Sequence, residues 1–118
     1  MNNNKKYNFF VTNNPPSSPI IEGSIFCRSG NLYNYTFCST DPESDNIYYL
    51  IHWGDGNVFY WTGPYKSGEK AVYSYCWFND PLIGNELIIE AQAMDIHYAK
   101  SDWSSFNVVV SIYYKFIV

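Results

Sequence analysis

Apolar and aromatic residues alternate with polar ones through most of the chain, in short runs that end at Gly, Pro, Asn or Asp. A period of two is typical of a strand with one buried face, and turn residues at this spacing are typical of a sandwich of short strands. No run shows the periodicity of a convincing helix. The pattern predicts strands at residues 20–27, 32–39, 47–53, 57–62, 69–77, 87–95 and 103 to about 114.

The run at 47–53 shows the alternation most clearly, because branched and aromatic residues fill it from end to end. Alternation assigns one set of side chains to the buried face: Ile47, Tyr49, Ile51 and Trp53. It assigns the other set to the outer face: Tyr48, Leu50 and His52. A packing or surface role is therefore expected for His52, since neither histidine lies in a metal-binding pattern.

The predicted fold is an all-β, immunoglobulin-like β-sandwich of about seven antiparallel strands in two sheets. An antiparallel barrel fits the same pattern and stays open as the alternative. Residues 1–19 are rich in Asn, Pro and Ser and are expected to form a linker or disordered lead-in. The sandwich is expected to span 20–114, with a C-terminal tail at 115–118.

The composition is typical of one β-rich domain and argues against a nucleic-acid partner. The chain has 118 residues, of which 20% are aromatic and 15% are charged, with a net charge of −4. A chain with so few basic residues offers no stripe that could neutralise phosphates, so we expect no nucleic-acid partner. The chain has no apolar run long enough to span a membrane and no visible signal peptide.

The three cysteines, Cys27, Cys38 and Cys76, have no metal-binding spacing. Alternation makes Cys38 and Cys76 candidates for the outer face of adjacent strands. Their redox state stays open, because isolated buried thiols and a single disulfide formed outside the cytosol both fit an odd count.

The strand at 47–53 runs into the turn Trp53-Gly54-Asp55-Gly56. Two glycines supply positive φ angles and an aspartate caps a tight reversal, so we interpret this turn as structural. Asp55 has no carboxylate partner at a spacing that indicates a glycosidase. The chain also has no nucleophile elbow and no phosphate-binding glycine loop, and we expect no enzymatic activity.

Acidic residues gather in two predicted loops: Asp41, Glu43 and Asp45 in one, Asp95 and Asp102 at the ends of the other. A sandwich can bring two such loops to the same end or to a neighbouring one. Carboxylate oxygens in flexible loops suit calcium, and the same residues are also ordinary turn formers. Both interpretations stay open, so calcium is the only cofactor that we consider.

The outer-face residues Tyr48 and Leu50, with Tyr60 and Tyr65 nearby in sequence, suggest a platform for a sugar ring or a partner domain. The alternative is that these side chains cover a neighbouring strand. A carbohydrate-binding module is accordingly the second functional hypothesis.

Several short motifs occur in a fixed order between about residue 20 and residue 112. They are Tyr33-Asn34-Tyr35-Thr36-Phe37, Thr40-Asp41-Pro42-Glu43-Ser44-Asp45, Trp53-Gly54-Asp55-Gly56, Gly63-Pro64-Tyr65, Ser67-Gly68-Glu69, Ser74-Tyr75-Cys76-Trp77, Ala93-Met94-Asp95 and Ser101-Asp102-Trp103-Ser104. In this order they resemble the polycystic-kidney-disease-type (PKD) domains, of the kind found in archaeal and bacterial surface proteins. The chain departs from the family where His52 replaces the usual Asp, Tyr75 the usual His, and Asn85-Glu86-Leu87 the common Gly-x-Tyr.

The resemblance implies a non-catalytic spacer or adhesion module of a surface or extracellular assembly, with a protein or glycan as partner. It also implies that calcium can bind in the acidic loops, as in some relatives. It does not imply an oligomeric state.

Overall fold

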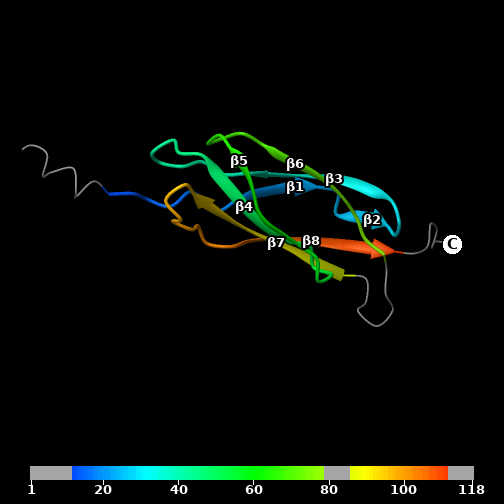
Figure 1. Ribbon diagram of the computed structural model, residues 1–118. Coiled ribbons are helices and arrows are strands. Elements are labelled where there is room, and N and C mark those ends of the chain that lie inside the picture. The colour runs from blue at the N-terminus through cyan, green and yellow to red at the C-terminus, as the bar shows by residue number, and fades with distance from the viewer. Residues whose placement is uncertain (1–11, 79–85, 112–118) are drawn as a thin grey trace, which may run out of the picture.

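The computed structural model describes residues 12–78 and 86–111, and these form eight strands in two sheets (Figure 1). The two sheets are separate, so the chain is a sandwich and the barrel alternative is excluded. The strands are β1 (Ile20–Gly23), β2 (Phe26–Arg28), β3 (Leu32–Cys38), β4 (Ile47–His52), β5 (Val58–Tyr65), β6 (Ala71–Cys76), β7 (Glu86–Asp95) and β8 (Ser104–Ser111).

The smaller sheet has the order β1-β3-β6 and is antiparallel throughout. The larger sheet has the order β2-β8-β7-β4-β5, in which β7 lies between β4 and β8. All its pairs are antiparallel except β2 with β8, which run parallel. This pair therefore departs from the antiparallel pattern that the sequence predicted.

The strand predicted at 20–27 is in fact two strands on different sheets. The chain leaves β1 after Gly23 and joins β8 of the other sheet at Phe26. The Tyr35 ring lies against Gly23, where an added Cβ would be 2.2 Å from the ring, and its hydroxyl donates to the Ser24 carbonyl at 2.6 Å. This bridge fixes the point where the chain changes sheets, and a period of two along the sequence does not reveal it.

Strand β5 is longer than predicted and is irregular. It reaches Tyr65, and its pairing with β4 shifts between Ile47 and Tyr49 and again between Tyr49 and Ile51. Each shift places an extra residue in β5, so inner and outer positions exchange along the strand. Several sequence predictions lie outside the described residues: 1–11 of the lead-in, the break at 79–81, Asn85, the end of the last strand at 112–114, and the tail at 115–118.

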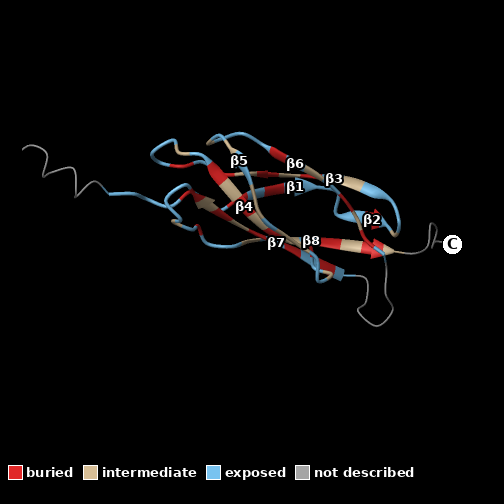
Figure 2. Ribbon diagram, in the orientation of Figure 1, coloured by how far each residue is buried: buried red, intermediate tan, exposed pale blue. Residues whose placement is uncertain are grey.

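The core between the sheets consists mainly of aromatic rings, and the predicted inner face of β4 is fully buried. Along β4 and the second half of β8, buried positions alternate with more exposed ones (Figure 2). Trp53 stacks on Tyr75 with ring centroids 4.2 Å apart and an interplanar angle of 1°. Its carbonyl accepts a hydrogen bond from the indole N–H of Trp77 at 2.9 Å. Rings of this size bury large apolar areas, so they contribute a major part of the stability.

Candidate metal site at the N-terminal end of the sandwich

Three segments meet at one end of the molecule: the incoming residues 12–19, the β3–β4 loop and the β7–β8 loop (Figure 1). The Trp53-Gly54-Asp55-Gly56 turn lies at the other end of β4. The two loops predicted to contain the acidic residues, β3–β4 and β7–β8, lie at the end where residues 12–19 enter the sandwich.

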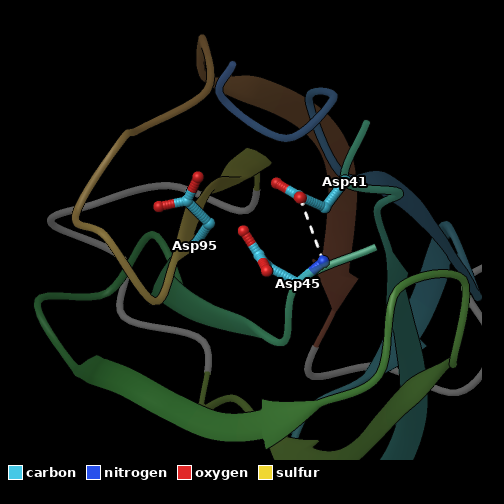
Figure 3. A group of neighbouring side chains, drawn as sticks. All are labelled: Asp41, Asp45 and Asp95. Carbon is cyan, nitrogen blue, oxygen red and sulfur yellow. Dashed lines mark hydrogen bonds between the residues drawn. The ribbon is translucent and has the colours of Figure 1, made fainter. Parts of the chain in front are cut away.

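Asp41, Asp45 and Asp95 form an acidic cluster there. One carboxylate oxygen from each lies within 4.8 Å of the chosen oxygens of the other two. Figure 3 shows the carboxylates of Asp41 and Asp45 on the side that faces Asp95. Asp41 and Asp95 are buried, whereas Asp45 is half-buried. The two loops are joined across the cluster by the His97 imidazole, whose Nε2 lies 3.6 Å from an Asp45 oxygen.

The two oxygens of Asp41 have different surroundings. Oδ2 accepts hydrogen bonds from the backbone N–H groups of Glu43 and Asp45, both at 3.0 Å, and so shapes the loop. Oδ1 is buried and has no hydrogen-bond partner among the described residues. Leaving a buried charged acceptor unpaired costs about 1–3 kcal/mol or more. Figure 3 shows this oxygen, the one without a dashed line, on the side of Asp41 that faces Asp95.

Asp95 is held in its ionised form although it is buried. Burial acts to raise the pKa of this carboxyl, but hydrogen bonds from the Asn13 side chain and from the Ala99 and His97 N–H groups outweigh burial and lower it. These three bonds measure 2.8, 3.0 and 2.8 Å. The side chain therefore keeps its negative charge at neutral pH.

The donor set of the acidic cluster fits a hard divalent cation. Calcium prefers carboxylate and carbonyl oxygens in a flexible site, and a positive ion would give the buried Asp41 Oδ1 the partner that it lacks. Asp41, Asp45 and Asp95 are the described residues that would hold the ion.

The structure separates the other two predicted ligands from this cluster. Glu43 is exposed and accepts hydrogen bonds from the backbone and side-chain nitrogens of Asn14. Asp102 is also exposed and lies beyond the bridge that joins Met94 to Lys100. The sequence predicted Glu43 and Asp102 as ligands, and the structure corrects this prediction. Residues of one loop can point in different directions, so these two side chains lie outside the cluster.

The described part of the lead-in, residues 12–19, is tied to the sandwich. The Ser17 N–H donates to the Thr40 carbonyl at 2.8 Å, Pro16 and Pro19 are buried, and Asn13 reaches Asp95. The sequence missed Asn13 as a site residue, because its partner is 82 positions away. An Asn next to the prolines looks like a linker residue, and only the fold shows what it contacts.

The Trp53-Gly54-Asp55-Gly56 turn is closed by its aspartate. Asp55 accepts from the Asn57 N–H at 3.0 Å and from the Tyr75 hydroxyl at 2.6 Å. Burial, together with the hydrogen bond to the negative Asp55, raises the pKa of Tyr75 to about 12. Tyr75 thus supplies the turn with a hydrogen-bond donor at the position where the related motif has His.

The predicted aromatic platform exists only in part. Tyr48 and Leu50 lie half-buried on the outer face of β4, and Tyr60 is 73% exposed. Tyr65 instead packs between the sheets, with its ring 5.8 Å from that of Tyr49 and 6.4 Å from that of Tyr73. Its assignment to a ligand surface is corrected, because the irregular pairing of β5 turns it inward.

Cys38 and Cys76 lie on adjacent strands of the smaller sheet, but at opposite ends of it. Cys76 pairs in register with Leu32 at the start of β3, whereas Cys38 is the last residue of β3. Strands rise about 3.3 Å per residue, so the two thiols are too far apart to bond. All three cysteines are free.

The chain was compared with known protein families, curated proteins and solved structures. Neither the known protein-family profiles nor the curated proteins contain a match to this chain. Among solved structures, the PKD domain of an M14-like peptidase from a Thermoplasmatales archaeon has a TM-score of 0.79 and 39% sequence identity, covering 85% of this chain and 99% of that one. A CARDB domain from Pyrococcus furiosus, solved in complex with di-metal ions, has a TM-score of 0.57 and 13% identity, covering 85% and 92%. The likeness to these structures confirms the immunoglobulin-like fold.

Proposed function

The chain belongs to the PKD domain family, and from this premise we propose that it is a non-catalytic spacer module of a surface or extracellular protein. The similar solved domain is one domain of a peptidase, which supports a role as an accessory unit beside other domains. No helix in the described part of the chain has the length and apolar character needed to cross a bilayer.

The attachment of residues 12–19 to Asp95 and to the β3–β4 loop is the observation that carries this proposal. A spacer transmits orientation only if the chain that enters it is fixed to the folded body. Asn13 bonds to Asp95, Asn14 bonds to Glu43, and Ser17 bonds to Thr40, so both loops hold the incoming segment.

Calcium bound by the acidic cluster would strengthen this attachment. It would offset the repulsion among three carboxylates and fix the β3–β4 and β7–β8 loops relative to each other. Because Asn13 bonds directly to Asp95, fixing these loops also fixes the start of the domain.

We therefore expect calcium to raise the melting temperature of the chain. Extracellular calcium modules bind with dissociation constants of about 0.1–1 mM, so about 10 mM calcium should stabilise the fold by about 1–3 kcal/mol. This corresponds to a rise of roughly 5–15 °C for a domain of this size. The double variant Asp41→Asn, Asp45→Asn should lose the rise, because it removes two ligand charges while the amide oxygen introduced at position 41 still accepts from the loop N–H groups.

A matched control is the double variant Glu43→Gln, Asp102→Asn, which removes the same number of charges outside the acidic cluster. It should retain the calcium-dependent rise. The calcium part of the proposal fails if wild-type protein shows no rise at 10 mM calcium, about ten times the weakest expected dissociation constant, or if both double variants respond alike.

A further inference from the structure

A cleft on the outer face of the larger sheet has no part in the proposed spacer role. It has a volume of about 270 Å³ and is lined by Tyr48, Trp61, Met94, Asp95, Ile96 and Tyr98. These residues come from β4, β5, β7 and the loop that follows β7. The Asp95 carboxylate belongs to the acidic cluster, so the side chains that give the cleft its character are aromatic and aliphatic.

The floor of the cleft is regular and its walls are not. Tyr48 and Met94 are register partners on neighbouring strands and form a rigid base. Trp61 lies in the stretch of β5 where the pairing with β4 shifts, and Tyr98 lies in the β7–β8 loop. Pairing irregularities re-aim side chains, and here they place a tryptophan beside the cleft.

Two of the residues that form the walls, Trp61 and Tyr98, have a strained backbone conformation. Trp61 has a φ of 43° and Tyr98 a φ of 70°, and Ser44 is the only other described non-glycine residue with a positive φ. Large side chains rarely adopt this conformation, and it persists only where the surroundings impose it. At Tyr98 the imposing contacts are clear, since its N–H donates to the Asp95 carbonyl and the Asp95 carboxylate holds the residues on either side.

The Tyr48 hydroxyl, the Trp61 indole N–H and the Tyr98 hydroxyl have no hydrogen-bond partner within residues 12–78 and 86–111. The Tyr98 side chain is 77% exposed although its backbone is held in place. One cation lies at the edge, where Lys100 Nζ is 5.4 Å from the centroid of the Trp61 ring. The cleft thus combines apolar ring faces with unpaired donors and acceptors around them.

We propose that this cleft binds one ring of a neutral carbohydrate. A pyranose has an apolar C–H face that packs on aromatic rings and hydroxyls that exchange hydrogen bonds with phenol, indole and ammonium groups. The volume is slightly below the range of about 300–1,000 Å³ typical of small-molecule pockets, so it suits one ring better than an extended peptide. Rigid tyrosine and tryptophan side chains lose little conformational entropy on binding, which favours this role.

The proposal is tested by titrating the full chain with soluble hexaoses of glucose, N-acetylglucosamine, mannose and xylose, each to millimolar concentration. Binding is followed by NMR shifts and by tryptophan fluorescence in calcium-free buffer, so that the result does not depend on the metal site. At least one sugar should shift Tyr48, Trp61 and Tyr98. Trp61→Ala and Tyr98→Ala should each weaken that binding by about tenfold or more, as expected when an aromatic stacking partner is removed.

Two matched controls lie outside the cleft, Tyr60 in β5 and Trp103 in the β7–β8 loop. Tyr60→Ala removes a tyrosine of similar exposure beside Trp61, and Trp103→Ala removes a second partly exposed tryptophan. Both should bind like the wild type. The proposal is overturned if no sugar causes shifts at these residues, if the controls weaken binding as much as the cleft variants, or if a proline-rich peptide binds there and the sugars do not.

Discussion

At the scale of single residues, Tyr75 shows how a substitution within a family motif is accommodated. Its ring stacks on Trp53 and its hydroxyl donates to Asp55, so one side chain joins the core to the turn. The Asn57 side chain donates to the same hydroxyl at 2.7 Å. A tyrosine therefore fills the position where related chains have His, and it stays within the hydrogen-bond network.

We predict that Tyr75→Phe lowers the free energy of unfolding by about 1.5–3 kcal/mol at pH 7, the usual range for a hydrogen bond to a charged group. The pKa of Tyr75 is about 12 in the folded chain against 10.0 in the unfolded one. A raised pKa gives a stabilisation that is complete below pH 10 and is lost as the pH rises through 12. Urea denaturation should show the difference between the two proteins shrinking above pH 10. A difference that does not change with pH would contradict this account.

Residue-level predictions from the sequence succeed where alternation is regular and fail where it is not. The buried faces of β3 and β4 follow from the period of two, as Phe37 and Tyr49 show. Tyr65 was placed wrongly because the irregular pairing of β5 changes which side of the strand faces the core. The role of Asn13 could not be predicted, since a hydrogen bond across 82 positions leaves no local signal.

At the scale of elements, the β4–β5 turn is packed against β7. A Cβ added at Gly54 would lie 2.7 Å from the Ile88 carbonyl oxygen, whereas a Cβ at Gly56 would meet no atom within 4 Å. Both glycines have a positive φ, 91° at Gly54 and 97° at Gly56. Both positions therefore need glycine for their positive φ. Gly54 also needs it because β7 lies too close to leave room for a Cβ atom.

Gly54 and Gly56 allow a comparison in which only the contact with β7 differs. Gly56→Ala should cost about 1–2 kcal/mol, the penalty for placing an alanine in a left-handed conformation. Gly54→Ala should cost at least about 1 kcal/mol more, because the turn must also move away from β7. Chemical denaturation of both variants measures the difference. Equal costs would show that the contact between the turn and β7 is not tight.

The ends of strands could be predicted where turn residues mark them. They could not be predicted where contacts with other strands determine them. Gly54 and Gly56 mark the end of β4, and the strand ends there. Gly23-Ser24 stands at the change of sheet between β1 and β2, but residues 20–27 were predicted as one strand, because the contact that fixes the change comes from the Tyr35 side chain of another strand. The prediction that the acidic loops meet was possible from topology alone, but the choice of Asp41, Asp45 and Asp95 from five acidic residues needed the coordinates.

At the scale of the whole molecule, the two ends of the sandwich differ in character. One end holds a closed, hydrogen-bonded turn, and the other holds the acidic cluster with the incoming segment bound across it. We propose that residues 12–19 belong to the folded body when calcium is bound. A spacer that fixes its incoming segment sets the direction of whatever precedes it, whereas a free segment sets only a distance.

Backbone ¹⁵N relaxation of residues 12–19 in the full chain, with and without calcium, measures whether this segment moves with the folded body. Prolines give no N–H signal, and among the other residues Asn13, Asn14 and Ser17 are the reporters, because these three form hydrogen bonds to the folded body. With calcium, we expect order parameters near those of the strands, about 0.85, at all three positions. Order parameters below about 0.6 in the calcium-loaded protein, with the strands rigid, would contradict it.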